Sequence, residues 1–235
     1  MGRTIDEGMT GGDGVAGQLI TVEGIDGCGK TTQLQLLASH CRSLGAEVVV
    51  TREPGGTDLG LQLRAVLLGG DPGSVDPLAE LLLYAADRAQ HVQRLIRPAL
   101  EAGKIVLCDR YVDASLAYQG YGRGFPLSLV AELNRLATGG LEPSRTLLYD
   151  LDVEEGLRRT RLRQSRLTES TTPVPEEDRQ DRLDREAAEF HRHVREGYLA
   201  VAATAPNRIR LLSAKGSIDE VFALTREAVA DLLPT

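Results

Sequence analysis

Gly24-Ile-Asp-Gly-Cys-Gly-Lys30-Thr31 has the spacing of a phosphate-binding loop, which is a glycine, four further residues and then Gly-Lys-Thr. Residues 18–23 before it are predicted to form a buried strand, and residues 31–38 after it to begin a helix. The three glycines allow the backbone to curl until successive N–H groups point at one phosphate, and the following helix adds its positive end. Lys30 can reach the outer phosphates, and the Thr31 hydroxyl can bind Mg²⁺. The segment therefore predicts a nucleotide and a magnesium ion, but not the reaction.

Length and composition are ordinary for a single globular domain. The chain has 235 residues, of which 42% are hydrophobic and 26% are charged. Its net charge of −7 argues against a general binder of nucleic acid. No apolar run approaches the length needed to cross a membrane, and residues 1–17 are polar and glycine-rich without a secretory apolar core. We expect a flexible tail over residues 1–17 and one domain over residues 18–235, with no nucleic-acid or membrane partner.

The three cysteines are Cys28, Cys41 and Cys108, and no two of them have metal-ligand spacing. Unpaired thiols of this kind are typical of a reduced, cytoplasmic protein. His191 and His193 are two residues apart, so on a helix they would point in different directions. The sequence therefore predicts a cytoplasmic protein without a metal site built from these residues.

Strand and helix patterns alternate along the chain, which favours a parallel sheet covered by helices on both faces. The expected strands are residues 18–23, 47–51, 105–109, 145–151 and 209–212. The expected helices are residues 31–44, 58–68, 77–102 with a kink at Pro98, 110–119, 126–138, 153–164 and 217–232, with a loop over residues 120–124. The predicted fold class is therefore α/β, with five parallel strands.

Residues 165–178 differ from their surroundings because they are polar and contain two prolines. One interpretation is a solvated linker between two exposed helices, since charge-rich flanks are common there. The other is a lid that folds over bound phosphates. The phosphate loop favours the lid, because phosphoryl transfer must exclude water. We place this mobile lid at about residues 158–182.

Asp109 and Arg110 follow the third strand directly. Ligands of an open parallel sheet bind at the carboxyl edge, where the first strand also delivers the phosphate loop. Asp109 can hold magnesium through water, and Arg110 can grip a phosphate with its planar guanidinium. The alternative is a structural ion pair at the end of the strand.

Two helical segments carry side chains suited to a flat base. Tyr84 and Arg88 lie four residues apart and share a helical face, so the ring can stack on a base while the arginine donates to a carbonyl. The alternative is a surface tyrosine beside an ordinary arginine. Ser115, Tyr118 and Gln119 are also spaced for one helical face. They form either a polar wall or a half-exposed surface, and the spacing does not choose between these.

Taken together, these segments resemble the thymidylate kinase family from about residue 18 to the C-terminus. The motifs that carry the resemblance are residues 23–32, Thr51-Arg-Glu-Pro-Gly-Gly-Thr57, Leu82-Leu-Tyr-Ala-Ala-Asp-Arg88, Asp109-Arg-Tyr111, Ala117-Tyr-Gln-Gly120 and Asp181-Arg-Leu-Asp184. The resemblance implies a nucleoside monophosphate kinase fold that transfers the γ-phosphoryl group of ATP to dTMP, giving dTDP and ADP for dTTP biosynthesis. It also implies Mg²⁺ as cofactor, ATP and dTMP as partners, and a homodimer.

The resemblance further implies how the base and sugar of dTMP are held. Tyr84 stands where the family stacks an aromatic ring on thymine, and Arg88 stands where it donates to a base carbonyl. Ser115 and Gln119 match polar contacts to the base, and Tyr118 matches a residue packed near the sugar.

The phosphate side follows in the same way. Arg64 and Arg110 match grips on the monophosphate, Glu53 lies beside the sugar and magnesium, and Asp26 lies near the acceptor's sugar hydroxyl or the metal. Thr31 and Asp109 are the metal candidates. The residues expected to bind ATP are Gly24, Ile25, Asp26, Gly27, Cys28, Gly29, Lys30, Thr31 and Thr32.

The position of one arginine separates two forms within the family. One form carries it in the phosphate loop, where this chain has Gly27, and the other supplies it from the lid. The chain resembles the bacterial form with a basic lid, and Arg159, Arg163 and Arg166 are the candidates, with Arg163 favoured. The expected catalytic set is Lys30, Asp26, Arg110 and Arg163.

Two rival functions stay open at this point. The first is a nucleoside monophosphate kinase that acts on dUMP, UMP or CMP, because a methyl group supplies only about 1–3 kcal/mol of discrimination. The second is a non-catalytic nucleotide-binding switch, which would not need the second set of residues from Arg64 to Gln119.

Overall fold

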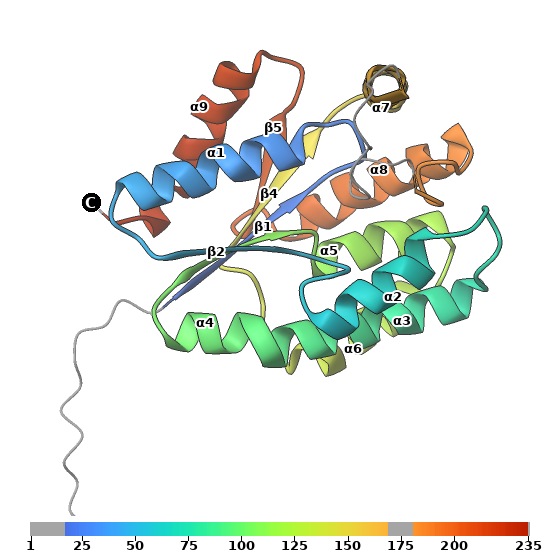
Figure 1. Cartoon of the computed structure of the whole chain (residues 1–235), viewed down its shortest axis with the longest axis horizontal. Coiled ribbons are helices and arrows are strands. Elements are labelled where there is room, and N and C mark those ends of the chain that lie inside the picture. Colours follow the sequence, from blue (N-terminus) through green and yellow to red (C-terminus); the bar gives the residue numbers. More distant parts are fainter. Residues whose placement is uncertain (1–16, 169–180, 235) are drawn as a thin grey trace, which may run out of the picture.

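The computed structural model describes residues 17–168 and 181–234. Five strands form one parallel sheet, as predicted (Figure 1). Their order in the sheet is β2-β3-β1-β4-β5. The strands are β1 (Gln18–Glu23), β2 (Val48–Arg52), β3 (Ile105–Asp109), β4 (Arg145–Asp150) and β5 (Ile209–Ser213). Asp109 lies beside both Val22 of β1 and Arg52 of β2 in the register. The carboxyl ends of these three strands therefore meet at one edge, and the residues that follow them are brought together.

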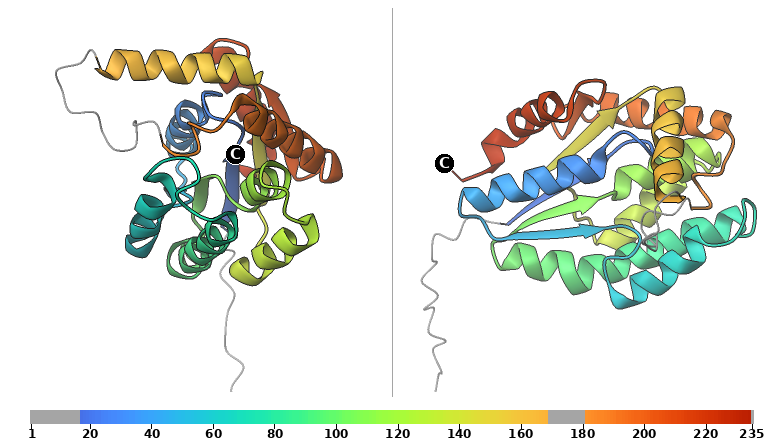
Figure 2. Two further views of the ribbon diagram at one scale, coloured as in Figure 1. Left: turned by 90° about the vertical axis from the view of Figure 1, so that its right-hand side faces the viewer. Right: turned by 45° about the horizontal axis from the view of Figure 1, so that its top comes forward.

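Helices cover both faces of the sheet (Figures 1 and 2). The α-helices are α1 (Lys30–Ser43), α2 (Asp58–Leu68), α3 (Pro77–His91), α4 (Arg97–Glu101), α5 (Val112–Ser115), α6 (Leu127–Thr138), α7 (Val153–Thr168), α8 (Ala188–Thr204) and α9 (Ile218–Val229). Two π-helical turns, η1 (Val92–Ile96) and η2 (Leu116–Gly122), join α3 to α4 and extend α5, and a short 3₁₀ turn, η4 (Ala230–Leu232), follows α9. In the part of the chain that the structure describes, no helix is both long and apolar enough to span a bilayer.

Alternating side chains of the central strands bury themselves in two separate clusters. Ile20 and Val22 of β1 point to the side of α1, where they pack with Leu34 and Leu37. Leu19 of the same strand points the other way and joins a smaller cluster with η1 and α4. This alternation follows from the two-residue period of a strand with both faces covered. The sheet is thus fixed from both sides, and its carboxyl edge is a rigid base for the loops.

Two predicted boundaries differ from the structure for backbone reasons. The single helix expected over residues 77–102 is divided by η1, which ends two residues before Pro98, because proline has no N–H to satisfy the carbonyl one turn earlier. The helix expected to end at Gln119 runs on through η2 to Gly122, so the loop predicted over 120–124 begins later. Of these two wide turns, η2 lies at the carboxyl edge of the sheet, where Tyr118 and Gln119 line the cavity described below.

The region around the expected lid is more helical than predicted. α7 continues to Thr168, so residues 165–168 are helical and not part of an irregular segment. Residues 169–180 of the expected lid and residues 1–16 of the expected tail lie outside the described residues. The helix after the lid, α8, is not an exposed flank, since Phe190, Val194 and Tyr198 are buried.

Candidate active site

The phosphate loop lies between the central strand β1 and helix α1, and its glycines have the backbone conformations that the motif requires. Gly24, Gly27 and Gly29 have φ angles of 136°, 78° and 94°. These lie in the region that L side chains rarely adopt, so only glycine fits without strain. Lys30 folds back over the loop and donates to the carbonyl oxygens of Gly24 at 2.9 Å and Ile25 at 3.0 Å. The loop is therefore shaped by its own lysine.

Gly27 has a second constraint, because the loop packs against α7. A Cβ atom at Gly27 would collide with the carbonyl oxygen of Gly156, and a Cβ atom at Gly156 would lie 2.7 Å from the carbonyl oxygen of Asp26. Two glycines thus permit the close approach of loop and helix. An arginine at position 27 would not fit this arrangement, so any cation in addition to Lys30 must come from another position.

A cavity of ≈ 1060 Å³ opens at the carboxyl edge of the sheet beside this loop. It is lined by residues from the loop, β2, β3, α2, α3, η2, α7 and residues 181–185. Most predicted site residues are among them: Asp26, Gly27, Gly29, Lys30, Thr31, Thr32, Glu53, Arg64, Tyr84, Asp109, Arg110, Ser115, Tyr118, Gln119 and Arg163. Predicted residues that do not line the cavity are Gly24, Ile25, Cys28 and Arg88. Ile25 and Cys28 are instead part of the hydrophobic core.

Arg110 occupies the centre of the cavity wall in a strained backbone conformation, with φ at 69°. Its guanidinium donates to Asp26 Oδ1 at 2.7 Å and to the Tyr198 hydroxyl at 3.1 Å, and it stacks 4.8 Å from the centre of the Tyr118 ring. Burial alone would raise the pKa of Asp26, but Arg110 and then Lys30 outweigh it and lower that pKa. Asp26 is therefore an anion that holds Arg110 in place.

Tyr198 and Glu23 complete this arrangement, and the sequence analysis did not identify either as part of the site. The Tyr198 hydroxyl donates to Glu23 Oε2 at 2.7 Å, while the Tyr111 N–H donates to Glu23 Oε1 at 2.7 Å. Burial raises the pKa of Glu23 to about 8, despite the nearby Arg110. The sequence pattern does not reveal the role of Tyr198, because its partners Glu23 and Arg110 lie far from it along the chain.

Glu53, which lines the cavity, is held in place by two basic side chains. Arg88 Nε donates to Glu53 Oε2 at 2.7 Å, and His91 Nδ1 lies 3.0 Å from Glu53 Oε1. Arg88 is itself 1% exposed and also donates to Ser115 Oγ at 2.9 Å and to Asn134. Arg88 therefore lies behind the residues that line the cavity, where it supports Glu53 and Ser115.

A second buried carboxylate, Glu80 of α3, supports the other end of the wall. Glu80 Oε1 accepts from Gln119 Nε2 at 2.9 Å and from Arg123 Nε at 3.2 Å, and Oε2 accepts from Arg123 and Arg182. Glu80 and Arg182 are both fully buried. Burial would raise the pKa of Glu80, but the hydrogen bonds from Arg123 and Arg182 lower it, so Glu80 is ionised at neutral pH.

Two aspartates that follow residues 169–180, Asp181 and Asp184, also line the cavity. Asp181 Oδ1 accepts from the Asp184 N–H at 2.8 Å, and Asp184 Oδ2 accepts from the Asp181 N–H at 3.1 Å. Burial, and then the negative charges of Asp26 and Asp181, raise the pKa of Asp184 to about 8. The sequence analysis used this pair only as part of a motif and assigned it no role.

Helix α7 contributes arginines to the cavity. Arg159 and Arg163 line the cavity, and Arg159 is held by Glu155 at 2.8 Å. The side chain of Arg166, the third candidate, lies outside the described residues. Asp109 also lines the cavity, and its Oδ1 atom is buried without a hydrogen-bond partner among the described residues. An orphaned carboxylate oxygen in the same cavity lining as Thr31 suits a hard cation such as Mg²⁺.

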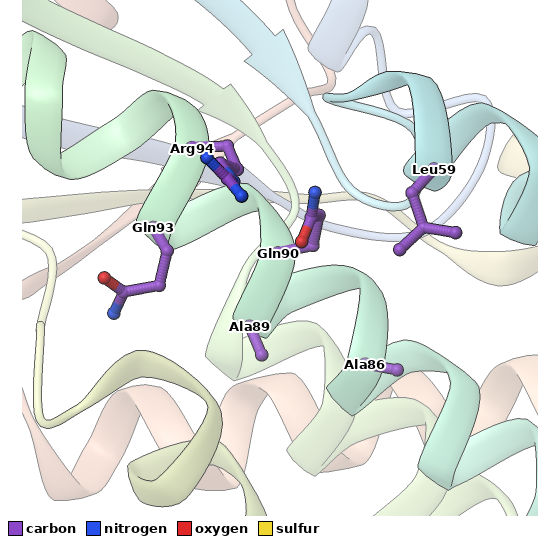
Figure 3. A pocket seen from close by; sticks show the side chains of 6 residues that line it. All are labelled: Leu59, Ala86, Ala89, Gln90, Gln93 and Arg94. Carbon is purple, nitrogen blue, oxygen red and sulfur yellow. The ribbon is translucent and has the colours of Figure 1, made fainter.

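A second hollow lies between α2 and the α3–η1 helix, away from the phosphate loop (Figure 3). Its volume is ≈ 560 Å³, and it is lined by Leu59, Ala86, Ala89, Gln90, Gln93 and Arg94. It brings together none of the predicted site residues. The chemistry therefore belongs to the larger cavity.

Comparisons with known proteins agree with this geometry. The family model described as thymidylate kinase matches residues 22–224. A thymidylate kinase from Geobacter sp. (strain M21) is 51% identical over 213 residues, which cover 91% of each chain. One from Synechococcus sp. (strain JA-2-3B'a(2-13)) is 52% identical over 215 residues, covering 92% of this chain and 95% of the relative.

A solved structure supports the same conclusion at the level of the fold. The crystal structure of thymidylate kinase from Ehrlichia chaffeensis superposes with a TM-score of 0.71 at 33% sequence identity, covering 92% of this chain and 99% of that chain. The chain belongs to the thymidylate kinase family.

Proposed function

We propose that this protein is an ATP-dependent thymidylate kinase, which transfers the γ-phosphoryl group of ATP to dTMP and releases dTDP and ADP. The observation that carries the proposal is a single cavity with two different ends. One end is the phosphate loop with Lys30. The other is a wall containing Tyr84, Ser115 and Gln119, and Arg110 lies between them. Donor and acceptor phosphates can therefore meet in one enclosed site.

The reaction needs little covalent chemistry from the protein. The acceptor is already an anion, so the main barrier is to bring two negatively charged phosphates together. Lys30 would hold the outer phosphates of ATP, and Arg110, fixed by Asp26, would grip the acceptor phosphate with Arg64. Arg163 of α7 would stabilise the negative charge that develops on the transferred phosphoryl group. Preorganisation by Asp26 and Tyr198 means that Arg110 needs little rearrangement.

The base and sugar would be held by the acceptor wall. The Tyr84 ring would stack on the base, Ser115 and Gln119 would contact its polar edge, and Tyr118 would pack beside the sugar. Arg88 is assigned here as a support of Ser115 and Glu53, since it is buried behind the wall. Its guanidinium would act on the base carbonyl only through Ser115 unless the site rearranges.

Mg²⁺ is the cofactor that the donor set fits. Thr31 would offer its hydroxyl and Asp109 its unpartnered carboxylate oxygen, directly or through water. When bound, the ion neutralises phosphate charge. Both residues line the same cavity as Lys30.

We also infer a homodimer that works in the cytoplasm. Exposed apolar side chains gather on α2, α3 and α6, which lie side by side: Leu59, Val66, Leu78, Leu82, Leu127, Leu129 and Leu136. A continuous apolar surface of this kind is usual at a subunit interface. The free, buried cysteines Cys28, Cys41 and Cys108 suit a reducing compartment. Light scattering on the purified protein would test the dimer, and a monomer mass at micromolar concentration would contradict it.

An assay of ADP release from ATP and Mg²⁺ across dTMP, dUMP, UMP and dCMP tests the function. We expect the highest kcat/KM with dTMP, a lower value with dUMP because only a methyl group is missing, and the lowest values with UMP and dCMP. The Lys30→Ala variant controls for contaminating kinases. ATP binding without ADP release on addition of dTMP would replace the proposal with the nucleotide-switch interpretation.

A further inference from the structure

Two polar side chains of the acceptor wall each contact a buried charged group, and these two groups have opposite charges. Gln119 Nε2 contacts the Glu80 carboxylate at 2.9 Å, and Ser115 Oγ contacts the Arg88 guanidinium at 2.9 Å. Glu80 and Arg88 are both essentially buried, at 0% and 1% exposure. Neither charged group lines the cavity, whereas Ser115 and Gln119 both do.

These contacts determine which atoms of the wall can donate and which can accept. An ionised carboxylate only accepts, so the Gln119 side chain must present its amide nitrogen to Glu80. Its carbonyl oxygen is then turned toward the cavity. A guanidinium only donates, so the Ser115 oxygen accepts from Arg88, and the hydroxyl proton is left to donate. Ser115 also keeps a second lone pair and can therefore donate or accept, whereas Gln119 offers the cavity an acceptor.

Pyrimidine bases differ in the complementary pattern. Thymine and uracil carry a proton on N3 beside the O4 acceptor, whereas cytosine has an unprotonated N3 beside an amino donor. An acceptor oxygen on Gln119 suits a protonated N3. Against cytosine, the same oxygen would face the N3 lone pair, so the discrimination comes from Gln119.

We propose that Glu80 is a specificity-determining positioning residue: by holding the amide nitrogen of Gln119, it turns the amide oxygen toward the bound base and so selects pyrimidines with a protonated N3. This inference rests on the proposed function and deepens it. Glu80 touches neither substrate, and its effect passes through Gln119. Its own orientation is fixed by Arg123 and Arg182, which occupy the remaining lone pairs.

The Glu80→Gln variant tests this role, because a neutral amide at position 80 can donate or accept and no longer dictates the orientation of Gln119. We expect the preference for dTMP over dCMP, measured as competition binding constants, to fall about tenfold, which is the scale of one hydrogen bond of about 1.4 kcal/mol. The preference for dTMP over dUMP should stay the same, because both bases carry the N3 proton. A merely structural defect would weaken all three ligands together.

A matched control is Arg123→Gln, which removes one cation from Glu80 but leaves the carboxylate, its buried partner Arg182 and its contact with Gln119 in place. We expect it to lower the melting temperature without changing either preference. A folded Glu80→Gln protein with an unchanged preference for dTMP over dCMP would overturn the inference, as would an equal change in Arg123→Gln.

If Glu80→Gln does not fold, neutron diffraction of the wild-type protein with bound dTMP decides the question. The expected result is a deuterated Gln119 nitrogen facing Glu80 and the oxygen facing the base. A deuterated nitrogen facing the base would refute the proposal. These outcomes are separate from failure of the proposed function, which is shown by a wild-type protein that releases no ADP when dTMP is added.

Discussion

The acceptor wall and helix α7 surround the same cavity but hold their charges in opposite ways. In the wall or behind it, Glu53, Glu80 and Arg88 are between 0% and 3% exposed, and their partners come from distant parts of the chain. On α7, Arg158 pairs with Glu155 three residues earlier, and its side chain is 60% exposed. Buried pairs are costly to break, whereas exposed pairs contribute about 0–1 kcal/mol. The wall is therefore preformed, while α7 can reorient its arginines at small cost when phosphates bind.

Lys30 lies where the two regions meet, and its removal should have the largest effect. We expect Lys30→Ala to lower kcat by about 10³-fold or more, the scale on which a cation at the transferred phosphoryl group acts, while the fold survives. Steady-state kinetics and circular dichroism would test this. Lys104→Ala is the matched control, because Lys104 pairs with the exposed Glu47 at 2.8 Å away from the site. Near-wild-type turnover in folded Lys30→Ala protein would remove Lys30 from the mechanism.

Arg88→Met tests the buried side of the comparison. It leaves the Glu53 carboxylate buried with only His91 beside it, so we expect a loss of about 3–5 kcal/mol in the free energy of unfolding. Arg158→Met on α7 should cost less than about 1 kcal/mol, because its ion pair is exposed. Urea unfolding of both variants measures the contrast, and similar losses would show that the wall is no more rigidly held than α7.

Arg163→Ala tests the adaptable side. We expect kcat to fall about 10²-fold or more while the affinity for dTMP changes little, because the arginine would act on charge that develops during transfer. Arg161→Ala is the control, since Arg161 is on the same helix but does not line the cavity. An unchanged kcat would move the role to Arg159 or Arg166.

Asp87 offers a smaller test of the buried network. Burial, and then the negative charge of Glu53, raise the pKa of Asp87 from 3.8 to about 6. The folded state thus binds this proton more tightly than the unfolded state, so the contribution of Asp87 to stability is present at low pH and is lost as pH rises from 3.8 to about 6. Relative to wild type, Asp87→Asn should therefore gain about 1–3 kcal/mol of unfolding free energy across this window. A pH-independent difference between the two proteins would contradict this.

The sequence was sufficient for the parts of the molecule that depend on local pattern. The phosphate loop and the five parallel strands were predicted because the glycine spacing and strand periodicity are local signals, and the resemblance to the family added about half of the cavity lining. Glu80 and Tyr198 were missed for the opposite reason. Each looks like a polar residue on a helix surface, and each becomes buried only when a partner more than a hundred residues away packs against it.

Arg88 shows a further limit of pattern. Its spacing from Tyr84 was read as direct contact with a base, but a shared helical face does not reveal depth. Four acceptors from other elements surround its guanidinium: Glu53, Tyr111, Ser115 and Asn134. Only the assembled fold could show that the arginine lies behind the wall.

The wide turn of η2 fixes the length of the segment that carries Gln119. Its two sides interlock with α8 through glycines: a Cβ atom at Gly122 would lie 2.7 Å from the Phe190 ring, and one at Gly197 would lie 2.7 Å from the Tyr121 ring. Deleting one residue of η2 before Gly122 would bring Arg123 into the place of Gly122, where a Cβ atom has no room beside Phe190. Natural and engineered variants should therefore accept substitutions in this segment far more readily than a change in its number of residues.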